Sequence, residues 1–225
     1  MRLGHKAIGS LLGLLLLTSP AAPRALDQCP NNTIDVCGVV VSNAPSYSTT
    51  GCGPASDGIG SYNLPAGMIT AQGDADYPDG YGNAHVTTDD IYHLVGPPTA
   101  AVISFSADLQ VHGQGSSYYC TAASGSATLR SGASQQVANF YGSSCRGEGV
   151  DAILSLPQVR SVGEPFHLVM DVVASASSGA SASMDGSLSF SGLPPGYAIE
   201  SCQGYVSNPT PSRPSSWGRL KLRYR

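Results

Sequence analysis

A two-residue alternation of apolar and polar side chains is the feature that most restricts the fold of this chain. In AAVISFSADLQVH, residues 100–112, apolar side chains occupy every second position from Ile103 to Val111, and polar ones mostly fill the positions between. Alternate side chains of an extended strand point to opposite faces. The pattern therefore predicts a strand with one buried face and one wet face.

The same alternation recurs later in the chain. It is found in VDAILSLP (150–157), PFHLVMDVVA (165–174) and SASMDGSLSFSG (181–192). Turn-forming segments separate the runs: GPPT (96–99), GQGSS (113–117), SVGEP (161–165) and LPPGY (193–197). Strands punctuated in this way predict an all-β fold, an antiparallel and jelly-roll-like β-sandwich of about eight strands. The Ser/Ala/Gly-rich tract 174–187 is interpreted as one strand whose outer face is small and polar.

Residues 27–83 lack this regularity. One short strand is predicted in VCGVVVS (36–42), and the other glycines and cysteines of the region predict loops held by disulfides.

The first 25 residues have the composition of an export signal. MRLGHK gives a positive start, AIGSLLGLLLLTSP an apolar run too short to span a bilayer, and AAPRA a cleavage zone. No later stretch is long and apolar enough to cross a membrane. We therefore predict a signal peptide (1–25), a β-sandwich domain (26–206) and a proline-rich linker with a basic tail (207–225). The expected location is secreted or extracellular, with the periplasm or the cell surface as alternatives.

Six cysteines follow the signal, and an even number in an exported chain predicts disulfides. They are Cys29, Cys37, Cys52, Cys120, Cys145 and Cys202. About three bridges are expected. Cys120 and Cys145 bracket a predicted strand pair, so they are predicted to bond with each other.

Charge is distributed unevenly. Residues 26–212 hold all 15 acidic residues and three arginines, a net charge of −12, whereas residues 213–225 hold five basic residues and no acid. An acidic body argues against nucleic acid as a partner. The basic tail is a candidate for contact with an anionic cell-envelope component, for folding back on the body, or for no function at all.

Two segments carry a family resemblance: GYGNAHVTTDDIYHLVG (80–96) and VGEPFHLVMDVVASASSGASASMDGSLSFSGLPPGYAIESCQGY (162–205). They resemble the strands of secreted bacterial β-sandwich proteins of the PEP-CTERM ectodomain type. That resemblance implies an exported sandwich, and most such ectodomains have no assigned activity. The Val-Pro-Glu-Pro sorting motif and its membrane helix are missing, so sorting by that route is not implied.

The acidic segment DADYPDG, residues 74–80, is the strongest candidate for a metal site. Hard carboxylate oxygens from Asp74, Asp76 and Asp79 suit calcium, although the spacing does not fit an EF-hand. The alternative interpretation is a Pro-Asp-Gly turn without a ligand.

Tyrosines in or beside Gly/Ser-rich segments suggest a second kind of site. These are Tyr62, Tyr77, Tyr81, Tyr118, Tyr119, Tyr141 and Tyr205. A tyrosine offers a flat apolar face with a polar tip, which suits sugar rings. We predict a glycan-binding patch at Tyr77, Asp79 and Tyr81.

The sequence contains no recognisable catalytic motif. No Gly-x-Ser-x-Gly elbow is present, and Asp89 and Asp90 are adjacent in a strand and so point to opposite faces. The histidines of the predicted domain, His85, His93, His112 and His167, are expected to be solvated surface residues. The leading hypothesis is a secreted non-catalytic module of the surface, matrix or adhesion type. A calcium-assisted carbohydrate-binding module for an extracellular polysaccharide is the first alternative, and a secreted hydrolase with an unrecognised site is the second.

Overall fold

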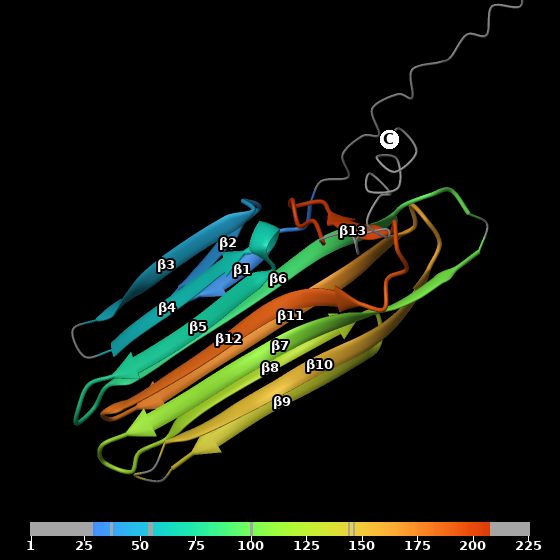
Figure 1. Cartoon of the computed structure of the whole chain (residues 1–225). Helices are drawn as coiled ribbons and strands as arrows, with labels where there is room; N and C mark the ends of the chain where they lie inside the picture. Colours follow the sequence, from blue (N-terminus) through green and yellow to red (C-terminus); the bar gives the residue numbers. More distant parts are fainter. Residues whose placement is uncertain are drawn as a thin grey trace, which may run out of the picture.

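The computed structural model describes residues 29–36, 38–53, 56–99, 101–143, 145 and 147–207, which contain thirteen β-strands and one 3-10 helix (Figure 1). The strands are β1 Asn32–Asp35, β2 Val39–Ser42, β3 Ser46–Gly53, β4 Ser56–Asn63, β5 Met68–Ala75, β6 Tyr81–Val95, β7 Ile103–Ser117, β8 Ala123–Ser131, β9 Ser134–Gly142, β10 Glu148–Arg160, β11 Pro165–Ser177, β12 Ala180–Ser191 and β13 Ala198–Ser201; the helix η1 is Leu64–Ala66. The predicted signal peptide and nearly all of the predicted linker and tail lie outside the described residues. No helix among the described residues is long and apolar enough to span a membrane.

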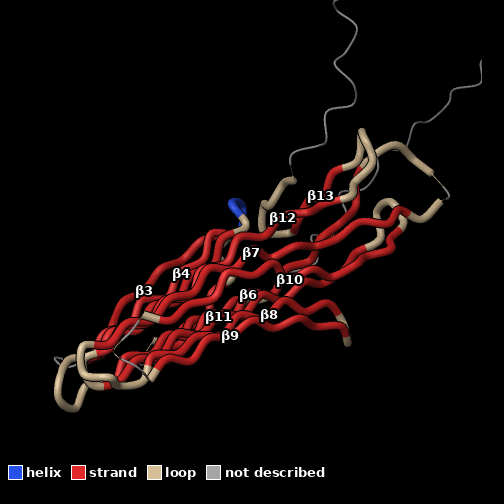
Figure 2. Tube along the Cα trace, turned by 60° about the horizontal axis from the view of Figure 1, so that its bottom comes forward, coloured by secondary structure: helices blue, strands red, loops and turns tan. Residues whose placement is uncertain are grey.

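The strands form two antiparallel sheets that pack face to face. The seven-stranded sheet has the order β2-β1-β6-β11-β8-β9, with β13 also paired to β6, and the six-stranded sheet has the order β10-β7-β12-β5-β4-β3. Figure 2 shows the sheets as two layers, with β6, β8, β9 and β11 in one and β3, β4, β7, β10 and β12 in the other. The predicted antiparallel sandwich is confirmed.

Eight of the strands have jelly-roll topology. The order β5-β12-β7-β10 lies opposite β6-β11-β8-β9, and consecutive strands lie in different sheets apart from the β8–β9 hairpin. β1 and β2 extend one sheet beyond β6, and β3 and β4 extend the other beyond β5. About eight strands were predicted, and this number fits the jelly roll but not the additions at its edge.

The alternation predicted from sequence agrees with the observed burial. In β7, Phe105, Ala107, Leu109 and Val111 are buried, and in β11 the buried positions run from Phe166 to Ala176 in steps of two. Full burial of a Val, Leu, Met or Phe side chain among them contributes about 1.5–3 kcal/mol relative to exposure, and an alanine contributes less. One continuous core between the sheets is the result.

Two predictions about local structure are wrong. Residues 27–83 were expected to be mainly loops, yet they form β1 to β5. The sequence pattern missed these strands because several inward positions are glycines, which carry no apolar side chain; they include Gly58, Gly60 and Gly73. The GQGSS segment was expected to be a turn, but β7 continues through it to Ser117.

The Ser/Ala/Gly-rich tract is also divided differently from the prediction. It contributes the end of β11 and the start of β12, joined by a two-residue hairpin at Ser178 and Gly179. Both residues have positive φ, 46° and 77°, as a primed hairpin turn requires.

The core differs between its two ends. At one end, five aromatic rings pack together between the sheets: Tyr92, Phe105, Phe166, Phe190 and Tyr205. At the other end, most inward positions are alanine or glycine, and Phe140 and Met184 fill the space against Gly113, Gly115 and Gly125. The two sheets approach most closely between β5 and β6. A Cβ added at Gly73 would lie 2.7 Å from the carbonyl oxygen of Gly82 on the opposite sheet, and one added at Gly82 would overlap the backbone of Asp74.

One disulfide is found toward each end of the sandwich. Cys29 bonds to Cys202 at the aromatic end, with Cα atoms 5.6 Å apart, and Cys120 bonds to Cys145 at the glycine end. The predicted Cys120–Cys145 bridge is therefore confirmed. The expected third bridge would need Cys37, which lies outside the described residues, so it stays a prediction.

Candidate functional site

Three loops meet at the glycine end of the sandwich, and we call this end the tyrosine pole. They are residues 76–80 between β5 and β6, residues 118–122 between β7 and β8, and the hairpin residues 178–179. The backbone N–H of Gly179 donates to the carbonyl of Ala75 at 2.8 Å, and that of Ser178 donates to the carbonyl of Gly80 at 2.9 Å. These hydrogen bonds hold the hairpin against the acidic loop.

The loop 118–122 is fixed by side chains as well as by its disulfide. The hydroxyl of Thr121 donates to the carbonyl of Ser178 at 3.0 Å, and the backbone N–H of Thr121 donates to the hydroxyl of Ser117 at 2.9 Å. Cys120 has a positive φ of 58°, an uncommon conformation for a residue other than glycine, and its bridge to Cys145 ties this loop to the segment between β9 and β10.

Tyrosine rings lie on the outside of this pole. Tyr77 and Tyr119 stack with ring centroids 4.1 Å apart, and both remain more than half exposed. Tyr118, beside them, is 91% exposed. The three rings border a groove of about 350 Å³, the tyrosine groove, which is lined by Asp74, Ala75, Asp76, Tyr77, Ser116, Tyr118, Tyr119, Gly179, Ala180 and Ser181.

The predicted glycan patch is only partly assembled at this groove. Tyr77 lines it, whereas Asp79 is exposed in the loop and Tyr81 is exposed at the start of β6, and neither lines the groove. Tyr118 and Tyr119 take the places beside Tyr77. In the sequence they are only two of seven tyrosines in or beside Gly/Ser-rich segments. Nothing near Tyr77 in the sequence signals that its stacking partner, Tyr119, lies 42 residues further along the chain.

Two of the seven tyrosines named from the sequence are not surface residues. Tyr62 and Tyr205 are buried, at 3% and 8% exposure. Tyr62 points inward from β4, and the Tyr205 hydroxyl donates to the carbonyl of Leu188 at 3.4 Å. Their glycine- and serine-rich surroundings suggested exposure. The expectation fails because glycine in this protein also occupies closely packed core positions.

The acidic segment forms the turn that the alternative interpretation predicts. Residues 77–79 make the turn, and the backbone N–H of Gly80 donates to the carbonyl of Asp76 at 2.9 Å. Asp74 belongs to β5, where its Oδ2 accepts a hydrogen bond of 2.7 Å from Gln72. Within the part of the chain that the structure describes, no three His, Cys, Asp or Glu side chains come together as a metal site. Calcium binding by Asp74, Asp76 and Asp79 stays a prediction.

A second groove, of about 500 Å³, lies on the outer face of the six-stranded sheet. We call it the sheet groove. Its lining comprises Gln72, Asp74, His112, Gly113, Gln114, Gly115, Ser116, Gly147, Glu148, Gly149, Val150, Asp151, Ser181, Ala182 and Ser183. His112 Nδ1 lies 2.5 Å from Asp151 Oδ1, and this hydrogen bond raises the pKa of His112 above its usual value.

The outer face of the other sheet holds a second histidine–carboxylate pair. His85 Nε2 lies 2.6 Å from Asp171 Oδ2, and this hydrogen bond raises the pKa of His85. Burial opposes ionisation of Asp171, but hydrogen bonds from His85 and Thr87 lower its pKa overall. The Thr87 hydroxyl is 3.2 Å from the same Nε2 atom. A nucleophilic triad needs the hydroxyl and the carboxylate on different ring nitrogens, so this cluster cannot act as one.

The predicted histidine environments are partly right. His85, His112 and His167 lie on outer sheet faces, but each is paired with a carboxylate, His167 with Asp89 at 3.2 Å. His93 is only partly exposed, and its Nδ1 is buried. The surface location was therefore predictable, whereas the pairing depended on strand register.

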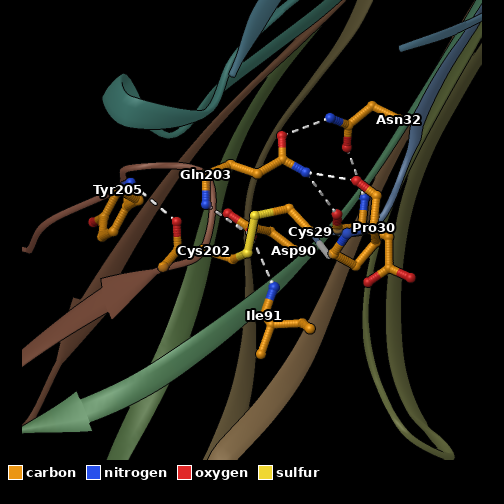
Figure 3. Close-up of a disulfide and its surroundings, with 10 residues drawn as sticks. Cys29, Pro30, Asn32, Asp90, Ile91, Cys202, Gln203 and Tyr205 are labelled. Atoms are coloured by element: carbon orange, nitrogen blue, oxygen red, sulfur yellow. Dashed lines mark hydrogen bonds between the residues drawn. A yellow bond between two sulfur atoms is a disulfide. The ribbon is translucent and has the colours of Figure 1, made fainter. Parts of the chain in front are cut away.

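A buried polar cluster surrounds the Cys29–Cys202 bridge (Figure 3). Asn32 Nδ2 donates to Gln203 Oε1 at 2.8 Å, and Gln203 Nε2 donates to the carbonyl of Pro30 at 2.8 Å. The N–H groups of Ile91 and Gln203 both donate to Asp90 Oδ1. Burial raises the pKa of Asp90 to about 6 despite these hydrogen bonds. We call this end the anchored pole, because the cluster joins the first strand to the last.

Comparison with known proteins yields no match to this chain, either among protein-family models or among curated proteins.

Proposed function

We propose that this protein is an exported, non-catalytic module that binds extracellular polysaccharide at its tyrosine pole. The observation that carries the proposal is the grouping of Tyr77, Tyr118 and Tyr119 around the tyrosine groove. Aromatic side chains bury large apolar area with few torsions to restrict, and the phenol oxygen stays hydrated. The apolar C–H face of a sugar ring is complementary to such a surface.

The support of the loops makes the site suitable for binding. Ligand sites gain affinity when their side chains are already held in position, because less conformational entropy is lost on binding. Here the Cys120–Cys145 bridge, the hairpin hydrogen bonds and the Tyr77–Tyr119 stack all restrict the same few residues. Tyrosines that face outward from fixed loops do not stabilise the core. Their exposed rings are therefore best explained by ligand binding.

The histidine–carboxylate pairs favour a non-catalytic interpretation. The Nε2 atom of His85 faces both the carboxylate of Asp171 and the hydroxyl of Thr87, which is not the arrangement of a nucleophilic triad. The polar environment of the sheet groove is likewise suited to hydrogen bonding with sugar hydroxyls. The predicted export signal and the two disulfides among the described residues are in accord with a site that meets its ligand outside the cell, and the resemblance to bacterial ectodomains points the same way.

The proposal is tested by the binding of the exported domain to a panel of plant, fungal and bacterial polysaccharides in affinity gels. A Tyr118→Ala/Tyr119→Ala variant should lose at least about tenfold in affinity, which corresponds to about 1.4 kcal/mol. Tyr141→Ala is the matched control, because Tyr141 is 66% exposed on β9 of the other sheet. The proposal is contradicted if no polysaccharide retards the parent protein, or if Tyr141→Ala loses as much affinity as the double variant. Parallel gels with EDTA or millimolar calcium test the predicted calcium dependence.

A further inference from the structure

The tyrosine groove and the sheet groove are continuous. Asp74, Ser116 and Ser181 line both of them. These residues lie on three neighbouring strands, since Ser181 of β12 is in register with Asp74 of β5 and with Ser116 of β7. A depression therefore runs from the tyrosine rings onto the outer face of the six-stranded sheet.

The shape of the sheet groove follows from side-chain size. β12 lies in the middle and contributes small residues, Ser181, Ala182 and Ser183. Gln72 and Asp74 rise on the β5 side. On the other side stand His112 of β7 and the acidic side chains of β10. From Ser116 to His112 the groove extends four residues, ~13 Å along a strand, so a linear ligand could continue beyond the tyrosines.

The charge of this depression is one-sided. Four carboxylates line it, Asp74, Asp76, Glu148 and Asp151, and none of the lining residues that the structure describes is Lys or Arg. Asp57 of β4 also lies directly opposite Asp74 in the sheet register. Like charges in that position destabilise a strand pair. A cationic group bound above the sheet would relieve this repulsion, whereas an anionic ligand would add to it.

We infer that the joined grooves bind a linear polysaccharide with free amino groups, such as a chain of glucosamine units. This inference rests on the proposed function and names the ligand class. Sugar rings stack on Tyr118 and Tyr119, and the chain then follows β12, with its ammonium groups facing Asp74 and Asp151. Among the described lining residues, the four carboxylates outnumber the one positive charge that His112 adds when its imidazole is protonated.

The test uses glucosamine oligomers from dimer to hexamer in calorimetric titrations at about pH 5.5, where amines are charged. The hexamer should bind at least tenfold more tightly than the dimer, and its affinity should fall as salt screens the carboxylates. The N-acetylglucosamine hexamer has the same backbone without the charge. It should bind at least tenfold more weakly than the glucosamine hexamer.

Two variants separate the groove from the tyrosines. Ser183→Trp fills the middle of the sheet groove and should remove the gain with chain length while leaving dimer affinity unchanged. Ser126→Trp, on the outer face of β8 in the other sheet, is its control. Asp74→Asn should weaken the glucosamine hexamer at least fivefold, whereas Asp35→Asn on β1 should not.

The outcomes distinguish this inference from the proposed function. Equal affinity for charged and acetylated hexamers overturns the ligand class, and a length gain that survives Ser183→Trp overturns the continuous groove. In both cases the tyrosine site still stands if Tyr118→Ala/Tyr119→Ala abolishes binding. Failure of the parent protein to bind any glycan overturns both.

Discussion

At the anchored pole, five aromatic rings pack inside the sandwich, whereas at the tyrosine pole the interior between β5 and β6 is glycine and alanine, and three tyrosine rings lie outside. The same strands run through both poles. β6, for example, begins at Tyr81 near the exposed tyrosines and carries buried Tyr92 eleven residues later. One strand thus serves both a thick, hydrophobic core and a thin region where two backbones almost touch.

Under the proposed function, one pole mainly provides stability and the other provides the binding surface. Burial of an aromatic ring contributes free energy of folding, whereas an exposed ring keeps its apolar face available to a ligand. Close backbone packing between β5 and β6 holds this side of the tyrosine pole in shape without large side chains. Variants at the two poles should therefore differ in which property they change.

The largest expected effect is the loss of stability when a disulfide is removed. The Cys29–Cys202 bridge spans 173 residues and the Cys120–Cys145 bridge spans 25. The loop-entropy relation gives roughly 5 kcal/mol for the first and roughly 3.5 kcal/mol for the second. In urea unfolding, Cys29→Ser/Cys202→Ser should lose the most stability and keep glycan affinity under native conditions. Cys120→Ser/Cys145→Ser should lose less stability but bind more weakly, and the reverse order would break the comparison.

Truncation of a core ring comes next. Phe166 contacts the rings of Tyr92 and Phe105 in the thick part of the core. Phe166→Ala should lower the free energy of unfolding by about 3–5 kcal/mol, because it removes buried area and leaves a cavity. Chemical denaturation measures the loss, and Tyr118→Ala, which removes an exposed ring, serves as the control with a change of less than about 0.5 kcal/mol. A similar loss in both variants would mean that the poles do not differ in this way.

A single added methyl group tests the close packing of the thin region. Gly82→Ala places a Cβ against the backbone of Asp74 and should cost about 1–3 kcal/mol, because neither strand can move away cheaply. Gly53→Ala is the matched control, since nothing lies within 4 Å of the added atom. Thermal melting that shows no difference between the two variants would contradict the close approach of the sheets.

The smallest expected effect concerns Asp90 and depends on pH. Its pKa of about 6 in the folded protein exceeds its ordinary value of 3.8, so ionisation costs more in the folded state. Stability from this group is fully present below about pH 4 and is lost as the pH rises through about 6. Asp90→Asn keeps the Oδ1 acceptor and cannot ionise. It should be about 1–2 kcal/mol more stable than the parent at pH 7.5, within the limit set by the shift.

The pH profile of the same variant provides the control. At about pH 4 its stability advantage should disappear, because Asp90 in the parent is then protonated. Urea unfolding at several pH values measures the difference between the two proteins. An advantage that is the same at every pH would show that the substitution acts through packing and not through charge.

The sequence predicted the jelly-roll strands well and their additions poorly, for a physical reason. In β7 and β11 the inward side chains are large and apolar, so the alternation is visible in the sequence. In β4 and β5 some inward positions are glycine, which carries no hydrophobic signal and is ordinarily unfavourable in strands. Their burial depends on the opposite sheet, which local sequence does not describe.

The candidate site was predicted in part for a similar reason. Tyr77 and Asp74 could be identified locally because they lie in one acidic segment. Tyr119 lies against Tyr77 only because the jelly-roll connections bring their loops together. Asp90 points inward and accepts a hydrogen bond from the N–H of Gln203, 113 residues away. Contacts between distant segments decide these environments, and a single sequence carries little information on them.

The Cys29–Cys202 bond has a geometric consequence for any attachment of the protein. It places the first and last described segments side by side, next to Ile91, whose carbonyl accepts a hydrogen bond from the N–H of Cys202. Ile91 is ten residues along β6 from Tyr81, a distance of ~33 Å. A surface or scaffold joined through either of these segments would therefore hold the domain by its base, and the tyrosine rings would project outward toward polymers in the surrounding medium.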